Sequence, residues 1–490
     1  MKAYSFANWN VNVYTRPFLF FIQSMEEMLF HYGHDSYKVP SLNFHFLCIE
    51  VFSCIHKIEI DILDKGNIRP LLEELNEMFL NDKIAQRLYG EDFQRLFFLK
   101  NDKGEYTRNN SSIIKEPTSE ASMHVIQKTL YFLIEDMENN DKYFQKLKKE
   151  IEIIVNDKNF TMENSKRLYN LSKLFLTEVI NRGYSQEYIY SQIKELYYSS
   201  KRRISDVSLE IEIFWNLFTF KNKEYEVFLP VKKTETKKLL QHFDTLKILD
   251  NKEGLFGNSS RWIVVVKIEA LDPERARLRA NFLMGFFVSL KQYNSHLSKS
   301  FYANQAIVRD IESQKEYLLK KPVTLLSRGQ TRSEEQTYIK IGEIFNSFPI
   351  IGEKMITAIN LHTSAMEDKN VSNQLLNLWT IIEVLVEVNK KYSYSKIVQI
   401  CNILTTVLNA SYIKSLVERL LLDLKHCCSD FDDYFLQVSK GNTEIEKMIA
   451  LLVLPEFAKV KDNLINSLSK YPLIKYRIED YSIQFSDRKN

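Results

Sequence analysis

Glycine, proline and cysteine are all scarce in this chain of 490 residues. It contains 12 Gly and 10 Pro, which disfavours loop-rich β-sandwiches, collagen-like repeats and disordered linkers. Few glycines also argue against phosphate-binding loops, and neither GxGxxG nor GxxxxGK[ST] occurs in the sequence. The five cysteines are too few, and odd in number, for a disulfide scaffold.

Long apolar runs are also lacking. No run approaches the roughly 18–20 residues that span a bilayer, and the first residues lack the basic end and cleavage site of a signal peptide. The formal net charge of +3 is too small to indicate a nucleic-acid or membrane partner by itself. We therefore expect a cytoplasmic protein without membrane spans.

What the chain does contain is helical periodicity at both ends, and the fold class we predict is mainly α. The length predicts roughly three domains. We expect a helical domain at 1–215, a small α/β module at 216–321, a linker at 322–336 and a second helical domain at 337–490. Apolar residues recur at helical spacing in five N-terminal segments, residues 42–63, 70–80, 123–138, 142–155 and 161–180.

The central module is distinguished by strand patterns. Residues 224–231 alternate, RWIVVVKIEA at 261–270 is a strong strand signal, and residues 303–308 are a weaker one. A short helix is predicted at 234–243, and a longer helix begins at Asp272-Pro273, a good N-cap followed by proline. This order of strands and helices predicts a ferredoxin-like module.

Basic charge is concentrated in the same part of the chain. Residues 216–328 contain 20 Lys and Arg against 12 Asp and Glu, a surplus of 8. Backbone phosphates need positive charge and stacked bases need aromatic neighbours. The candidate nucleic-acid-binding residues are Arg202, Arg203, Lys232, Lys233, Arg275 and Arg279. The alternative is a solvated charged face with no ligand.

Metal-binding and thiol chemistry are disfavoured by spacing. His45, Cys48, Cys54 and His56 lie on one predicted helix. Residues 45 and 56 are about 16 Å apart along its axis, so the four side chains cannot bind one ion. We interpret them as packing residues and predict neither metal nor cofactor. The segment 31–35, HYGHD, is interpreted as a polar loop tip.

One helix in the second helical domain has a distinctive sequence. Residues 373–387, NQLLNLWTIIEVLVE, place leucines and Trp379 on one face and polar residues on another. This helix resembles the opening helix of Apea-like HEPN domains of bacterial anti-phage and abortive-infection proteins. The resemblance covers residues 339–480, and the upstream segments 177–198 and 214–230 are similar to stretches of large proteins that end in such a domain.

The resemblance implies a four-helix domain that forms a homodimer or binds a partner subunit. In active members it is a metal-independent ribonuclease, in which an Arg stabilises the phosphate and a His moves a proton during attack by the RNA 2′-hydroxyl.

In the motif of active members, four to six residues separate the Arg from the His. Only Arg419 and His426, in RLLLDLKH, fit this spacing. Leu420 departs from the polar residue usual after the Arg, and no His follows Arg477 or Arg488. Two interpretations stay open, an RNA-cleaving enzyme and a non-catalytic, shortened scaffold or sensor that binds nucleic acid, a phage protein or a partner subunit. Because adjacent helical residues diverge by about 100°, His426 is not placed to activate Cys427.

Overall fold

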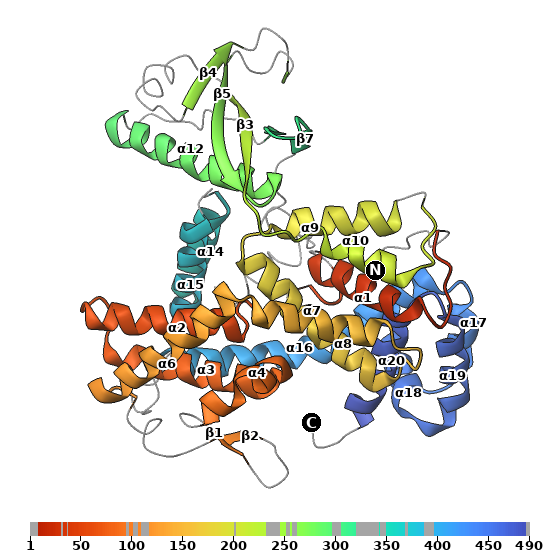
Figure 1. Ribbon diagram of the computed structural model, residues 1–490. Helices are drawn as coiled ribbons and strands as arrows, with labels where there is room; N and C mark the ends of the chain where they lie inside the picture. Colours follow the sequence, from red (N-terminus) through yellow and green to blue (C-terminus); the bar gives the residue numbers. More distant parts are fainter. Residues whose placement is uncertain are drawn as a thin grey trace. The chain divides into compact units, whose positions relative to one another are not determined.

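The computed structural model confirms a mainly α-helical fold with one small α/β part (Figure 1). By contacts the chain divides into two compact units. Unit 1 combines Met1–Lys221 with Arg419–Asn490, and unit 2 is Asn222–Glu418. The structure describes residues 8–30, 33–36, 38–94, 98–100, 106–108, 117–199, 202–231, 246–250, 255–256, 262–295, 305–319, 343, 349–367, 371–386 and 396–486.

The N-terminal part of unit 1 is built from helices that start where the sequence supplies capping side chains. Asn43, Thr161 and Ser185 each accept a hydrogen bond from a backbone N–H of the first turn. The helices are α1 (Arg16–Leu29), α2 (Phe44–Glu59), η1 (Lys65–Asn67), α3 (Ile68–Asn81), α4 (Lys83–Gln94), α6 (Glu120–Asn139), α7 (Lys142–Val155), α8 (Met162–Asn181), α9 (Gln186–Ile193), η2 (Lys194–Tyr198) and α10 (Val207–Trp215); β1 (Phe98–Lys100) pairs with β2 (Tyr106–Arg108).

Helix α1 is the centre of this unit. Every residue from Pro17 to Leu29 is buried, including the polar residues Gln23, Ser24, Glu26 and Glu27. Its Phe21 ring packs edge-on against Phe175 of α8 and Phe214 of α10. These aromatic contacts join helices that lie far apart in the sequence into one core.

The C-terminal helices of unit 1 are α17 (Phe431–Leu436), α18 (Glu444–Val453), η5 (Pro455–Phe457), α19 (Ala458–Ser467) and α20 (Pro472–Ser486). Gln23 of α1 attaches α20, because its amide donates to the Lys470 carbonyl at 3.0 Å and accepts from the Leu473 N–H at 3.2 Å. The predicted domain limits stay predictions. The compact units run differently, since they divide the predicted 337–490 domain within α16 (Lys396–Cys427).

Unit 2 contains a five-stranded antiparallel sheet in the order β4-β5-β3-β6-β7. The strands are β3 (Lys223–Val231), β4 (Leu246–Asp250), β5 (Trp262–Ala270), β6 (Ala306–Asp310) and β7 (Glu316–Leu319). If β3 is counted as the first strand of the module, the order β4-β5-β3-β6 reads 2-3-1-4 with all neighbours antiparallel. This is the strand order of a ferredoxin-like module, and β7 extends it at one edge. The predicted helix at 234–243 and the predicted linker at 322–336 lie outside the described residues.

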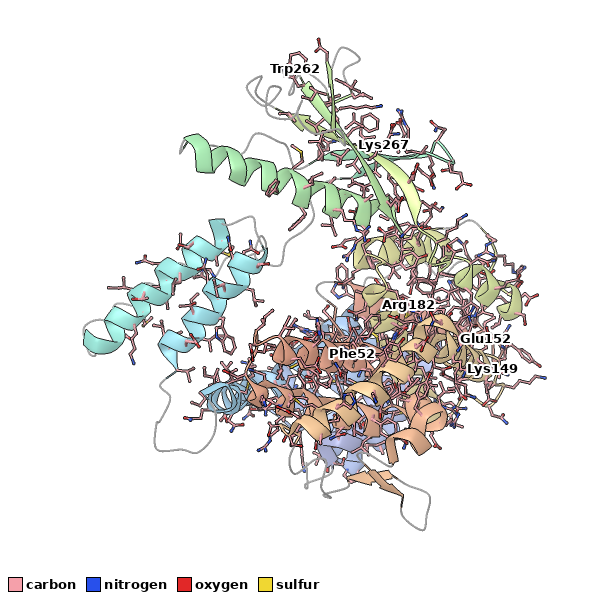
Figure 2. All side chains as sticks on the ribbon, turned by 60° about the vertical axis from the view of Figure 1, so that its left-hand side comes forward. Phe52, Lys149, Glu152, Arg182, Trp262 and Lys267 are labelled. Atoms are coloured by element: carbon pink, nitrogen blue, oxygen red, sulfur yellow. The ribbon has the colours of Figure 1, made fainter. Side chains whose placement is uncertain are left out.

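Helix α12 (Pro273–Ser295) covers one face of this sheet. Asp272 caps it by accepting from the Arg275 N–H at 2.8 Å, as its sequence predicts. Alternate strand residues, among them Val227, Val264 and Val308, form one buried cluster with the inner face of α12. Figure 2 shows α12 beside β5, the strand that carries Trp262 and Lys267.

Three further helical segments of unit 2 are α14 (Pro349–Glu367), α15 (Val371–Leu385) and the first part of α16, and α14 packs against α15. No single described helix is long and apolar enough to cross a bilayer. Two stretches of α16, Gln399–Asn409 and Tyr412–Cys427, meet the length and composition requirement only when taken together. The first part of α16, as the term is used below, is the portion up to Glu418 that belongs to unit 2.

Candidate functional site

The predicted catalytic pair lies near the C-terminal end of α16, and both side chains are exposed. Arg419 donates from Nη1 to the carbonyl of Gly33 at 3.2 Å. His426 donates from Nδ1 to the carbonyl of Leu422, one turn earlier, at 2.7 Å, which leaves Nε2 as the proton acceptor of the ring. The two residues share a helix face but lie about 10 Å apart along the axis.

The two thiols beside His426 are unsuited to nucleophilic chemistry. Burial, with the nearby Asp423 carboxylate, raises the pKa of Cys427 to about 12, so very little thiolate exists at neutral pH. Cys428 is buried, and its Sγ lies 3.5 Å from Ser467 Oγ. These contacts agree with a packing role for both cysteines.

The predicted nucleic-acid-binding residues occupy different environments. Arg202 forms an ion pair with Glu210 at 2.6 Å, while Arg203 is exposed. Lys232 and Lys233 lie outside the described residues. Arg275 and Arg279 stand on α12, where Arg279 is exposed and Arg275 half-buried. The structure thus joins only the last two on one element.

A group of buried charges that the sequence did not reveal surrounds Arg477 of α20. Its guanidinium donates from Nη1 to Asp423 Oδ2 at 2.9 Å, and from Nη2 to Glu27 Oε2 at 3.0 Å and Asp35 Oδ2 at 2.6 Å. These four side chains are at most 8% exposed. Together with His34 and Tyr481 they make up what we call the Arg477 cluster.

His34 completes the cluster through both ring nitrogens. Its Nδ1 donates to Asp35 Oδ1 at 3.2 Å, its Nε2 accepts from the Tyr481 hydroxyl at 3.0 Å, and its backbone N–H donates to Glu27 at 3.0 Å. The prediction that residues 31–35 form a polar loop tip is wrong for His34 and Asp35, which are 3% and 1% exposed. The polar residues turn inward because Arg477, from the other end of the chain, lies beneath them.

The pKa values of the cluster follow from this arrangement. Burial alone would raise the pKa of Asp35, but the Arg477 charge and the donors His34 and Lys38 hold it well below 3.8. Burial, the largest single effect, would raise the pKa of Glu27, but nearby positive charges, with Arg477 first among them, together lower it. Burial and the Arg477 charge lower the pKa of His34, so the imidazole stays neutral. The pKa of Arg477 is raised by its three carboxylates against the effect of burial.

This cluster holds segments together rather than exposing reactive groups. Its charged atoms are removed from solvent, so a substrate has no access to them. It connects α1, residues 33–36, α16 and α20, which come from both ends of the sequence. The available signal was Glu27 in FLFFIQSMEEML, a segment rich in large apolar residues, since a charge on a buried helix requires a partner.

A second buried group surrounds Glu178 of α8. Its carboxylate accepts from Asn43 Nδ2 at 2.7 Å, His45 Nδ1 at 3.0 Å and Arg182 Nε at 2.7 Å. Burial would raise the pKa of Glu178, but these donors lower it. Arg182, labelled in Figure 2, also lies over the Phe144 ring at 5.0 Å. The donor set holds α2 to α8 and explains the buried His45.

The four His and Cys residues that the sequence analysis considered as metal ligands are divided between the core and the surface. His45, Cys48 and Cys54 are buried on α2, and His56 is exposed. Within the described residues, no group of three or more His, Cys, Asp and Glu side chains is arranged to hold a metal ion.

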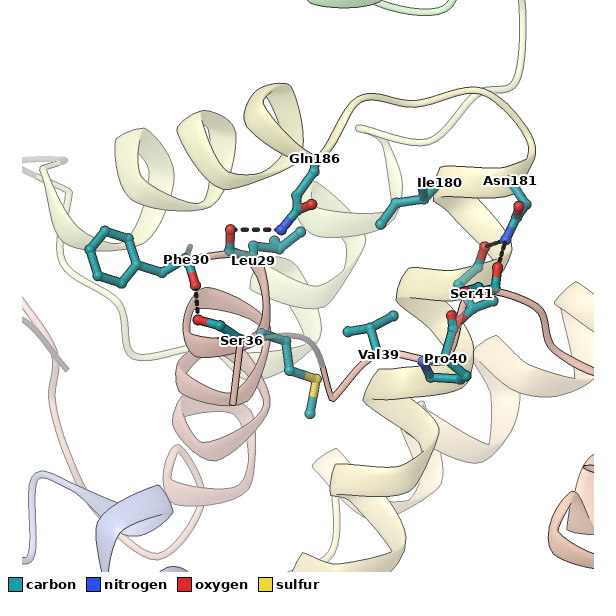
Figure 3. A pocket seen from close by; sticks show the side chains of 11 residues that line it. Leu29, Phe30, Ser36, Val39, Pro40, Ser41, Ile180, Asn181 and Gln186 are labelled. Atoms are coloured by element: carbon teal, nitrogen blue, oxygen red, sulfur yellow. Dashed lines mark hydrogen bonds between the residues drawn. The ribbon is translucent and has the colours of Figure 1, made fainter. Parts of the chain in front are cut away.

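A cavity of about 200 Å³ lies where residues 28–41 meet α8 and the start of α9. Figure 3 shows that the polar groups around it bond to one another. Gln186 donates to the Leu29 carbonyl at 3.0 Å, and Asn181 donates to the Ser41 carbonyl at 2.9 Å. The walls contributed by Val39, Leu29 and Ile180 are apolar, so the cavity presents few groups for recognition.

The most unusual surface in unit 2 belongs to α14, α15 and the first part of α16. Ala358 and Ala365 are buried on one face of α14, whereas Ile356, Ile359 and Met366 on the opposite face are 40–45% exposed. The same exposure continues on the other two helices. The exposed apolar helical residues, as we call this set, are Ile356, Ile359, Met366, Leu375, Leu376, Leu385, Ile397, Ile403, Val407, Leu408, Tyr412 and Ile413.

Comparison with known proteins adds no further identification. No protein-family model matches the chain, and neither curated proteins nor solved structures gave a significant match.

Proposed function

We propose that this chain is a HEPN-like protein of bacterial anti-phage defence that acts in the cytoplasm as a non-catalytic scaffold and self-associates through α14, α15 and the first part of α16. The observation that carries this proposal is the set of exposed apolar helical residues. Apolar helices of soluble proteins bury such faces, and large exposed apolar patches mark interaction sites. The HEPN resemblance of the same helices supports the assignment.

The apolar exposure of these helices, summed over several helix faces, is comparable with one side of a dimer interface. Twelve large apolar side chains in the described residues of these helices are 40–67% exposed. A half-exposed side chain of this size holds roughly 60–100 Å² of apolar surface, so the set holds on the order of 1,000 Å². A specific interface buries about 800 Å² on each partner.

Charge favours a second copy as the occupant. Residues 397–413 contain no Asp, Glu, Lys or Arg. In a two-fold interface the same patch faces itself, so like charges would repel, and the stretch 397–413 of α16 has no charged residue to do so. A partner that binds mainly through charge would require charged residues on this surface.

The test measures molar mass by light scattering after gel filtration. Val407→Glu and Leu376→Glu each put a charge at a position that is 63–64% exposed, and we expect both variants to elute as monomers while the original protein elutes as a dimer. Leu436→Glu, in α17 at 78% exposure, is the matched control and should remain dimeric. A monomeric original protein at micromolar concentration would sink the proposal.

The defence role has its own test. Cells that express the protein should give fewer phage plaques than cells with an empty vector, and Val407→Glu should lose this protection while Leu436→Glu keeps it. Equal plaque numbers with all variants and with the empty vector, across a broad phage panel, would contradict a defence role even if the protein dimerises.

RNA cleavage by Arg419 and His426 is the second candidate function. It is favoured by the exposure of both side chains and by the His426 hydrogen bond that leaves Nε2 as a proton acceptor. In such a reaction His426 would take the proton of an RNA 2′-hydroxyl, whose oxygen attacks phosphorus. The bond from phosphorus to the 5′-oxygen breaks as that oxygen takes a proton from water, and Arg419 would stabilise the negative phosphate. The HEPN resemblance implies that two such Arg and His pairs, one from each subunit, form one site, so this function would use the second copy too.

A further inference from the structure

Helix α12 has two chemically different faces. Ala276, Ala280 and Met284 follow one another at four-residue spacing and are fully buried against the sheet. The opposite face carries Arg275, Arg279, Phe282 and Phe286 at positions i, i+4, i+7 and i+11, which share one stripe of a helix. We call these four residues the basic–aromatic stripe.

The aromatic half of the stripe is strongly exposed. Phe282 is 83% exposed and Phe286 is 55% exposed. Leu278, at 37% exposure, flanks them. Ala276, Ala280 and Met284 already fill the space between the inner face of the helix and the sheet, so Phe282 takes no part in that packing. Two phenyl rings in line on a solvent-facing surface present flat apolar faces to a ligand.

The basic half of the stripe keeps its charge available. Arg279 donates from Nη1 to the backbone carbonyl of Glu269, a contact that orients the guanidinium without neutralising it. The nearby Glu274 carboxylate pairs with the buried Arg277 at 2.6 Å. Neither Arg275 nor Arg279 forms an ion pair with a carboxylate in the part of the chain that the structure describes. Two uncompensated positive charges therefore stand beside two aromatic rings.

We propose that the basic–aromatic stripe of α12 binds single-stranded nucleic acid, with phosphates on Arg275 and Arg279 and bases stacked on Phe282 and Phe286. Phosphate contacts and base–aromatic stacking are the two interactions that such strands use on proteins. The stripe extends about 16 Å along the helix, the length of four or five stacked nucleotides at about 3.4 Å each.

Other occupants fit this stripe less well. A duplex keeps its bases paired and stacked, so it offers the phenyl rings nothing to stack on. A second copy facing the same stripe would bring four arginines together, and their repulsion would oppose the contact. The proposal concerns a different surface from the exposed apolar helical residues and does not depend on self-association.

The experiment measures fluorescence anisotropy of a labelled oligouridine with the full chain over a salt series. Phe282→Ala should weaken binding about 5- to 150-fold, the loss of one stacked base. Phe132→Ala, at a ring that is 67% exposed on α6 in unit 1, is the matched control and should bind as the original protein does. Arg279→Gln should reduce the slope of log affinity against log salt by about 0.7, the value for one phosphate of a single strand.

Three outcomes would overturn the proposal. They are no binding of oligouridine by the original protein, unchanged binding by Phe282→Ala, and an unlabelled duplex competing as well as the single strand. Arg309→Gln, on β6 and paired with Glu316 at 2.6 Å, controls for general loss of positive charge and should leave the salt slope unchanged. Melting curves check that each variant is folded, which its exposed position favours.

Discussion

Arg477 Nη2 donates to Asp35 Oδ2 at 2.6 Å although 442 residues separate the two in the sequence. Both side chains are buried, at 3% and 1% exposure. This ion pair attaches α20 to the segment that follows α1, while Gln23 holds the start of α20. The N-terminal and C-terminal helices of unit 1 consequently share one core, and the stability of each should depend on the other.

Removing the Arg477 guanidinium should destabilise unit 1 strongly. Arg477→Met keeps much of the volume but leaves the Glu27, Asp35 and Asp423 carboxylates buried without their cation. Breaking a buried pair in this way costs about 3–5 kcal/mol, to be measured by urea unfolding. Lys459→Ala, at an exposed position of α19, is the control and should change the unfolding free energy little. Equal stability of Arg477→Met and the original protein would show that the cluster contributes nothing net.

Gly33 should tolerate no side chain. A Cβ there would lie 2.9 Å from both the Glu27 carbonyl and Glu27 Oε2, so Gly33→Ala must displace backbone as well as a ligand of Arg477. We expect a loss of about 1–3 kcal/mol. Gly66→Ala is the matched control, since nothing lies within 4 Å of its Cβ position. The hypothesis fails if the two alanine variants unfold at the same urea concentration.

The cluster also predicts how stability depends on pH. Asp35 has a folded-state pKa well below 3.8, so the stability it contributes is present above pH 3.8 and is lost as the pH falls below that value. Asp35→Asn should therefore be less stable at neutral pH, but its stability should fall less steeply below pH 4. Urea unfolding at a series of pH values measures both effects, and a parallel shift at all pH values would argue against this assignment.

Protonation of His34 should change the stability of the protein at a higher pH than protonation of Asp35. Its pKa is lowered from 6.5 in the folded state, so the unfolded chain binds a proton that the folded protein does not, and stability falls as the pH drops through 6.5. The slope from this group is at most about 1.4 kcal/mol per pH unit. His34→Gln should flatten the stability curve between pH 7 and 5, while His56→Gln, exposed on α2, should not. Identical slopes for both variants would contradict the prediction.

His426→Ala separates the two candidate functions. If the scaffold function is correct, purified protein leaves RNA intact and the variant differs in neither activity nor melting temperature, because the side chain is exposed and bonds only within its own helix at Leu422. If RNA is cleaved, the substitution should reduce the rate about 10²- to 10⁴-fold without loss of stability. Cleavage that persists unchanged in His426→Ala would remove this residue from the reaction.

Local features of the sequence predict most helices and the central strands. Helix α7 occupies the predicted residues Lys142–Val155. Gly183, two residues after α8, has a φ of 119°, which favours glycine after a helix end. The outer strands β4 and β7, of five and four residues, were not predicted. The strand predicted at 303–308 begins later, at Ala306.

Sequence periodicity determines which face of a helix is apolar, because side chains three and four positions apart share a face whatever lies opposite. It does not determine what that face meets. Arg419 and Arg477 both lie on helices near the C-terminal end, yet one is exposed and the other is 3% exposed. The difference arises because folding places α20 against α1 and residues 33–36, whose carboxylates then contact Arg477. Burial of a charge depends on such partners. Tertiary structure alone decided which arginine became part of the core and which stayed on the surface.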